Sequence, residues 1–264
     1  MPKYAAKIEY DGSQYVGYQV QPNGHSIQAA IEKALKLMAK LPQGQHIPTA
    51  SAGRTDAGVH ALGQVLHFDY PSRLPETAFR KALNSLLDPS IRVLNVVEVA
   101  EDFHCRYMAV SKEYVYRVDL NDYPDPFKRL YTLHHPYKID IERMQTAIVS
   151  ILGEHDFTSF CSTKTDKTDL VRTIYAASVD YDSNMNELNF YFKGNGFLYN
   201  MVRILVGTLL QIGDGLKPVN ELQRLLAVKD RQEAGPTAPP QGLYMVKVNY
   251  EQDPFEIEVI DKRV

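Results

Sequence analysis

The chain has 264 residues, of which 44% are hydrophobic and 23% are charged, close to the averages of globular proteins. This composition excludes collagen-like, disordered and coiled-coil proteins, and the length suggests one large domain or two modest ones. The net charge is −3, which argues against a protein that coats nucleic acid through its overall charge. The last fourteen residues alone carry −3, so the rest is neutral and any basic surface must be local.

The sequence shows no membrane span, no secretion signal and no paired cysteines. No apolar run approaches the roughly 18 residues of a membrane span. Residues 1–9 carry charges where a secretion signal would be apolar, so we expect a cytoplasmic protein that does not enter a membrane. Cys105 and Cys161 stand far apart and form no CxxC pair. Neither a disulfide framework nor a zinc site is therefore expected.

The first half of the chain alternates strands with helices. Residues 4–10 alternate polar and apolar side chains, as a half-buried strand does. Ser26 is suited to cap a helix over 27–38, whose apolar residues recur at helical spacing. Strands are expected over 63–70 and 91–99, with a helix over 75–87 between them.

The second half repeats this order. A helix expected over 197–212 is apolar on all sides and should be buried. Two copies of the strand and helix pattern predict an α+β fold of two similar domains, residues 1–106 and 107–264. Each would hold a mostly antiparallel sheet with helices on one face, and an active-site cleft would lie between them. The remaining expected elements are strands over 113–118, 171–181, 187–192 and 243–250 and helices over 141–152 and 218–228.

The loop at 53–61 is the first candidate site. Two glycines bracket Asp56 at a spacing that allows a sharp turn and a close approach of the backbone to a substrate. Arg54 lies near the carboxylate, which in partly apolar surroundings needs a cation to stay ionised. An isolated Arg-Thr-Asp sequence is more often a turn with an Asx hydrogen bond and a surface ion pair.

Residues 112–117, KEYVYR, are the second candidate. On a strand, Lys112, Tyr114 and Tyr116 share a face, so the rings are able to stack on a base while the flanking cations hold phosphates. The alternative is a strand whose tyrosines pack in the core and whose charges face solvent. That is the commoner outcome for this pattern taken alone.

The third candidate is Arg203, the only charge over several turns of the helix expected over 197–212. A buried cation needs an anion, which here is either a structural acid or Asp56. The Gly194-x-Gly196 pair that precedes the helix does not indicate a dinucleotide fold, because Tyr199 stands at the position of the third glycine. Motifs of P-loops, HExxH metal sites, nucleophile elbows and calcium loops are absent.

Taken together, five motifs closely resemble those of the tRNA pseudouridine synthase A family, in the same order. The resemblance runs from residue 7 to residue 250. The GRTDxGVHA loop is highly specific, and five ordered motifs make coincidence improbable. The motifs are GRTDAGVHA at 53–61, FHCR at 103–106, KEYVYR at 112–117, FLYNMVR at 197–203 and GLY at 242–244.

Membership would imply an isomerase that converts uridine to pseudouridine at positions 38, 39 and 40 in the anticodon stem-loop of tRNA. The family acts as a homodimer without a metal or an organic cofactor. The resemblance makes Asp56 the catalytic aspartate, Tyr114 the tyrosine that stacks on the uracil, and Arg203 the ion partner of Asp56. Arg54 and His60 are assigned to binding of the flipped nucleotide or its phosphate. Whether Asp56 attacks the sugar, attacks the base or removes a ribose proton stays open.

Two other functions fit part of this pattern. A tRNA-binding module without catalysis would use Tyr114 and the cations, but it has no use for Asp56 beside bound phosphates. A carboxylate-dependent nucleoside hydrolase would release free uracil, which an isomerase does not. We expect the isomerase, because Asp56 argues against a module without catalysis and the five ordered motifs resemble those of the isomerase family.

Overall fold

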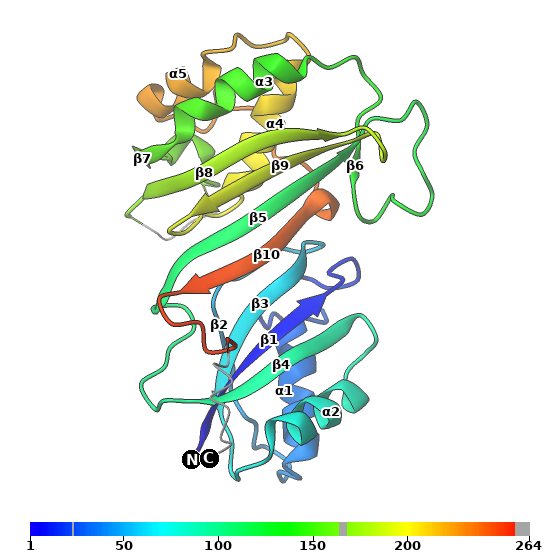
Figure 1. Cartoon of the computed structure of the whole chain (residues 1–264), viewed down its shortest axis with the longest axis vertical. Helices are drawn as coiled ribbons and strands as arrows, with labels where there is room; N and C mark the ends of the chain where they lie inside the picture. Colours follow the sequence, from blue (N-terminus) through cyan, green and yellow to red (C-terminus); the bar gives the residue numbers. More distant parts are fainter. Residues whose placement is uncertain (23, 164–167, 257–264) are drawn as a thin grey trace, which may run out of the picture.

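The fold is taken from a computed structural model that describes residues 1–22, 24–163 and 168–256. A ten-stranded sheet in the order β4-β1-β3-β10-β5-β9-β8-β7 forms its centre, with β2 beside β3 and β6 beside β5. Figure 1 shows the sheet running along the molecule, with α1 and α2 at one end and α3, α4 and α5 at the other. The strands are β1 (Lys3–Tyr10), β2 (Ala50–Ser51), β3 (His60–Asp69), β4 (Ile91–Val99), β5 (Ala109–Asp119), β6 (Leu133–His134), β7 (Gly153–Asp156), β8 (Val171–Asp182), β9 (Glu187–Gly194) and β10 (Leu243–Tyr250). The α-helices are α1 (Ile27–Met38), α2 (Glu76–Leu86), α3 (Ile141–Ile148), α4 (Met201–Gly213) and α5 (Glu221–Val228).

The N-terminal end of the sheet is built from β1, which pairs antiparallel with β3 on one side and β4 on the other. The expected alternation is present, since Ile8 and Tyr10 are buried while Lys7 and Glu9 are half-exposed. Helix α1 begins as predicted, because the hydroxyl of Ser26 accepts a hydrogen bond from the amide of Ala29 at 3.2 Å. Helix α2 packs against β4.

The C-terminal end consists of β5, β9, β8 and β7, which pair antiparallel in that order. Helix α3 packs against β8 and against α4, and α4 also contacts β5. Nearly every residue of α4 is buried, as its apolar sequence predicts. Because α4 is buried on all sides, its position is fixed. A side chain that extends from α4 toward the sheet is therefore held in a defined position.

The separate sheets expected for the two halves are instead one sheet, because β10 joins them. β10 pairs antiparallel with β5 along its length. On its other edge it pairs parallel with β3, with Tyr244 opposite His60 and Met245 opposite Ala61. Both edges of β10 thereby find partners for main-chain groups that would otherwise be unpaired. A single hydrophobic core includes residues of both halves.

Three helices start or end elsewhere than the sequence indicates. The helix expected over 197–212 begins at Met201, because Asn200 adopts a left-handed backbone with φ 60° and leaves the preceding residues in a loop. The helix expected over 141–152 ends at Ile148 and continues as a 3₁₀ turn over Val149–Ile151. The helix expected over 218–228 begins at Glu221.

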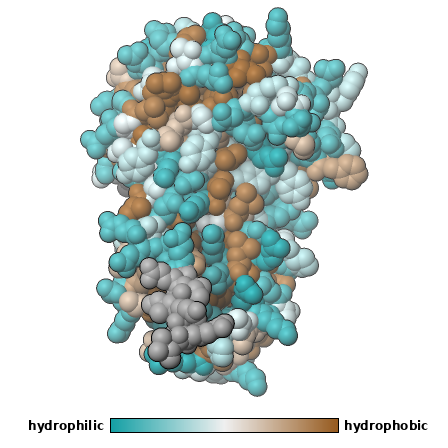
Figure 2. Space-filling model, viewed as in Figure 1, coloured by the Kyte–Doolittle hydropathy of each residue, from teal (hydrophilic) through white to brown (hydrophobic). Residues whose placement is uncertain are grey.

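Within the described ranges, no helix is long and apolar enough to cross a membrane. Figure 2 shows a band of hydrophobic side chains over β10 and β3, flanked by hydrophilic residues. Figure 1 draws no helix in front of these two strands. Side chains of this band therefore lie at the surface on this side of the sheet.

Candidate active site

The loop that carries Asp56 is held by a buried amide side chain on β3. Gln64 donates from Nε2 to the carbonyl of Gly53 at 2.7 Å, and its Oε1 accepts from the amide of Gly53 at 3.3 Å. Gln64 is fully buried, so these bonds satisfy groups that have no access to water. The space at Gly53 is tight, because a Cβ there would lie 3.0 Å from Cε of Met245, whose flexible side chain would have to shift slightly.

A second segment supports the loop from the other side. Gly17 has φ +112°, and a Cβ on it would lie 2.9 Å from the carbonyl oxygen of Thr55. The next residue, Tyr18, donates its amide to that same carbonyl at 3.0 Å. The hydroxyls of Thr55 and Tyr10 are 2.7 Å apart, so β1 also contributes to the support. Asp56 is therefore carried by a rigid loop between two buried anchors.

Asp56 and Arg203 meet although 147 positions separate them in the chain. Nη1 of Arg203 donates to Oδ2 of Asp56 at 3.3 Å. Their side chains are 14% and 29% exposed, respectively, so the pair is partly shielded from solvent while the carboxylate stays reachable. The structure thus decides between the two partners open to Arg203, in favour of Asp56.

Two further bonds fix the guanidinium of Arg203. Its Nε donates to the carbonyl of Ala238 at 2.7 Å, and Nη1 donates to Oδ1 of Asn200 at 2.9 Å. Asn200 precedes α4 and makes no side-chain cap for that helix, so its amide is free to accept from the arginine. Arg203 is consequently a preorganised cation, which is the kind of group that stabilises a negative charge at low reorganisation cost.

Burial raises the pKa of the Asp56 carboxyl, and the charge and hydrogen bond of Arg203 act in the opposite direction. The rise prevails, so the carboxylate is a stronger base and nucleophile than an exposed aspartate. Without Arg203 the desolvation of the carboxyl would be uncompensated. The arrangement suits a reaction that needs an ionised and reactive carboxylate.

Of the two tyrosines expected to share a face on β5, only Tyr114 borders the site. It is buried, and its ring packs edge-on against Phe197 with centroids 4.9 Å apart. Burial raises the pKa of its hydroxyl, and the charge of Asp56 adds to the rise, so the phenol stays neutral. The hydroxyl of Tyr116 instead donates to the carbonyl of Pro239 at 2.7 Å. Tyr116 is therefore a core residue, which is the alternative that the sequence left open for this strand.

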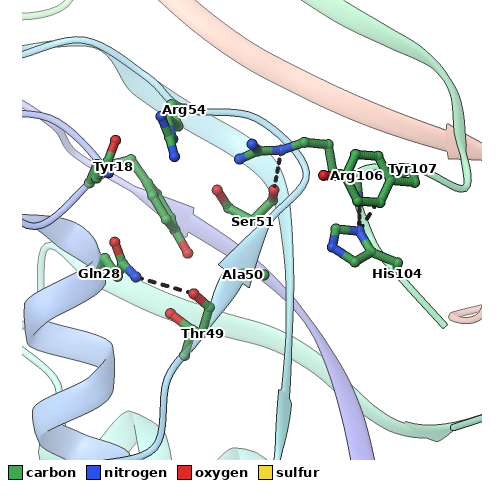
Figure 3. A pocket seen from close by; sticks show the side chains of 10 residues that line it. Tyr18, Gln28, Thr49, Ala50, Ser51, Arg54, His104, Arg106 and Tyr107 are labelled. Carbon is green, nitrogen blue, oxygen red and sulfur yellow. Dashed lines mark hydrogen bonds between the residues drawn. The ribbon is translucent and has the colours of Figure 1, made fainter. Parts of the chain in front are cut away.

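Arg54 and His60 lie apart from the ion pair. Arg54 is exposed and lines a neighbouring pocket (Figure 3). His60 is only 2% exposed, its Nδ1 accepts from the amide of Gly12 at 3.1 Å, and its Nε2 lies 3.0 Å from the carbonyl of Leu130. Its ring stacks on Tyr244 with centroids 4.8 Å apart. The geometry favours a supporting role for His60, because both ring nitrogens are engaged by the protein.

Three supporting residues were not found from the sequence. The sequence could have indicated that Gln64 is buried, because it stands two residues before Leu66 and so lies on the inward face expected for that strand. No sequence pattern indicates the roles of Asn200 and Gly17, because these roles depend on contacts with other segments. Among the described residues no group of three or more His, Cys, Asp or Glu side chains is placed to bind a metal ion.

Comparison with known proteins shows the family of this chain. A family model for tRNA pseudouridine synthase matches residues 6–108 and 147–251. A tRNA pseudouridine synthase A of Latilactobacillus sakei is 51% identical over 248 residues, covering 94% of this chain and 98% of that protein. Those of Lacticaseibacillus casei and Streptococcus pneumoniae are 50% and 48% identical, covering 95% and 96% of this chain and all of their own lengths. The chain belongs to the tRNA pseudouridine synthase family and is an enzyme of the isomerase class.

Proposed function

We propose that this enzyme converts uridine to pseudouridine at positions 38, 39 and 40 in the anticodon stem-loop of tRNA. The observation that carries the proposal is the Asp56–Arg203 pair at 3.3 Å, in which Asp56 belongs to the GRTDAGVHA loop that resembles the family motif. Nothing is added to or lost from the nucleoside overall. The N1–C1′ bond breaks, the uracil turns, and a C5–C1′ bond forms, while the proton on C5 leaves and N1 gains one.

Asp56 is the essential carboxylate of this reaction. It acts on C1′ of the sugar, on C6 of the base, or on a ribose proton, and each route requires its ionised form. Arg203 keeps that form populated in spite of burial. In this proposal the neutral phenol of Tyr114 stacks on the uracil and relays the C5 proton, its oxygen taking that proton as its own O–H proton passes to solvent.

A uridine in a paired stem must leave the stack before it reaches Asp56. Extrusion costs a few kcal/mol, which contacts to the base and to the backbone offset. Tyr114 supplies the aromatic contact, and Arg54 holds the flipped nucleotide or its phosphate. His60 contributes through the packing of the loop that it helps to anchor.

The two halves, residues 1–106 and 107–264, form the walls of the substrate cleft in this proposal. The boundary is supported by β4, which ends at Val99, and β5, which begins at Ala109. Asp56 comes from the first half, and Tyr114 and Arg203 come from the second, so catalysis needs both. Because β10 ties the halves into one sheet, the cleft should change little in shape between the free and bound enzyme.

The test is to map pseudouridine in an unmodified tRNA transcript incubated with the purified protein. The wild type should form it at positions 38 to 40 without added metal or cofactor, and Asp56→Asn should bind the transcript but form none. Turnover by Asp56→Asn would refute the role of Asp56. Free uracil in the reaction would indicate a hydrolase, and binding without any modification would indicate a non-catalytic module.

A homodimer in the cytoplasm completes the proposal, on the basis of the family resemblance. Light scattering of the purified protein should give twice the 30.0 kDa of one chain. A mass of one chain at micromolar concentration would refute the dimer.

A further inference from the structure

A pocket of about 180 Å³ adjoins the catalytic loop at Arg54. Residues of four separate segments line it, including Tyr18, Ser51 and the stretch from His104 to Tyr107. None of the lining side chains is acidic. The proposed chemistry at Asp56 does not use this pocket beyond Arg54.

Two cations without acidic partners face each other at the pocket. Figure 3 shows the guanidinium groups of Arg54 and Arg106 reaching toward one another above Ser51. Nε of Arg106 donates to the carbonyl of Ser51 at 3.1 Å, which fixes this side chain. Within the part of the chain that the structure describes, neither its two terminal nitrogens nor the guanidinium of Arg54 makes a hydrogen bond or ion pair. Like charges held this way repel one another unless an anion lies between them.

An exposed pair of rings forms the rim of the pocket. The ring of Tyr107 is stacked on His104, with centroids 4.1 Å apart and planes at 28°, yet Tyr107 is 81% exposed. Nδ1 of His104 accepts from the amide of Arg106 at 3.2 Å, so the rings are tied to the segment that carries the cation. A large ring that is preorganised but uncovered is a platform for a nucleobase.

The pocket also contains a buried polar group without a partner. Tyr18 is 2% exposed, and its hydroxyl has no hydrogen bond of acceptable geometry among the described residues, although Thr49 lies beside it. A buried hydroxyl in this state is costly unless something else binds it. The hydroxyl points toward Thr49 and away from the two guanidinium groups (Figure 3), so it does not contact a ligand held between them.

We propose that this pocket binds a backbone phosphate of the RNA next to the reacting nucleotide. Arg54 and Arg106 hold the phosphate, and the adjoining base stacks on Tyr107. Arg54 and Asp56 are two residues apart, at most about 7 Å along the chain, a span comparable to one nucleotide step. This inference rests on the proposed function, because it assumes that the reacting nucleotide lies at Asp56. Phosphate contacts position an RNA without reading its sequence.

The experiment compares Arg106→Gln and Arg106→Lys with the wild type. The control is Arg80→Gln, an exposed arginine on α2 outside the pocket lining. The Kd for a tRNA transcript is measured against salt concentration, beside kcat and KM for pseudouridine formation. Arg106→Gln should raise Kd and KM about tenfold and reduce the slope of log Kd against log salt by about 0.7 to 0.9. Arg106→Lys should keep the wild-type slope, although it loses the bond to Ser51.

The stacking part is tested separately with Tyr107→Ala, which should weaken binding about tenfold, whereas Tyr107→Phe should restore most of the loss. Equal salt slopes for Arg106→Gln, Arg80→Gln and the wild type would overturn the phosphate site. An effect shared by Arg106→Gln and Arg106→Lys would also overturn it, since that points to the structural bond alone. If the wild type forms no pseudouridine, the proposed function is refuted. The salt dependence of Kd still tests the phosphate site, because it does not depend on turnover.

Discussion

Replacing Arg203 with glutamine removes the cation from Asp56 and keeps a side chain of similar length. In the wild type the charged atoms are 3.3 Å apart. At an effective dielectric constant of about 20 this distance corresponds to a Coulomb attraction of about 5 kcal/mol. Solvent reaches part of both side chains, so the net contribution falls to about 2 kcal/mol, as for other hydrogen bonds to charged groups.

If the ionised carboxylate is the reacting group, a loss of about 2 kcal/mol in its stabilisation lowers the rate by up to about 30-fold, and the full deficit appears only where the pH lies below the pKa of Asp56. The pH dependence gives the sharper test. Burial already raises the pKa of Asp56, and Arg203 opposes that rise. Without the guanidinium the pKa rises further, so the acidic limb of kcat/KM must move to higher pH. The deficit of the variant should therefore shrink as the pH is raised.

The assay is the initial rate of pseudouridine formation across a pH series, with tRNA well below its KM so that the rate reports kcat/KM. The matched control is Asn200→Gly, which tolerates the positive φ of this position, removes one hydrogen bond from Arg203 and leaves its charge. It should lower the rate by less than tenfold and leave the acidic limb nearly in place. A profile of Arg203→Gln that parallels the wild type at every pH, in a protein of normal thermal stability, would refute the electrostatic role of Arg203.

Three further predictions concern the same site. Asp56→Asn should abolish turnover and stabilise the fold at neutral pH by about 1 kcal/mol, measured by thermal or denaturant unfolding. The sign follows because folding raises the pKa of Asp56, so the folded protein favours the protonated carboxyl. The wild type therefore loses stability as the pH rises through that pKa, and Asn, which carries no charge, avoids this loss. A variant Asp56→Asn that is less stable than the wild type at neutral pH would contradict this. Gln64→Leu should destabilise the fold by about 2 to 4 kcal/mol, because the amide and carbonyl of Gly53 lose their buried partners, and an unchanged denaturation midpoint would show that Gln64 is not the anchor. Tyr114→Phe should keep the Kd for tRNA within a factor of two while Tyr114→Ala weakens binding about tenfold in an equilibrium titration; equal effects would exclude stacking.

The sequence by itself determined the local elements and singled out the loop at 53–61 as the candidate site. Hydrophobic periodicity and the Ser26 cap act between residues close in the chain, so β1 and α1 form as expected. The spacing of glycines around Asp56 marked the loop, and the match to the family pattern marked Tyr114 and Arg203. These features are readable because each depends on neighbouring residues or on a motif of fixed spacing.

Only the tertiary structure decided which distant groups meet. Periodicity cannot tell which strand β10 will pair with, and its pairing with both β3 and β5 merges two expected sheets into one. Arg203 had two partners open to it, and the docking of buried α4 beside the loop selected Asp56. Tyr114 and Tyr116 have the same residue type and strand face, yet one borders the site and the other is bound to Pro239. Such choices depend on packing between segments far apart in sequence, where no local free-energy preference distinguishes the alternatives.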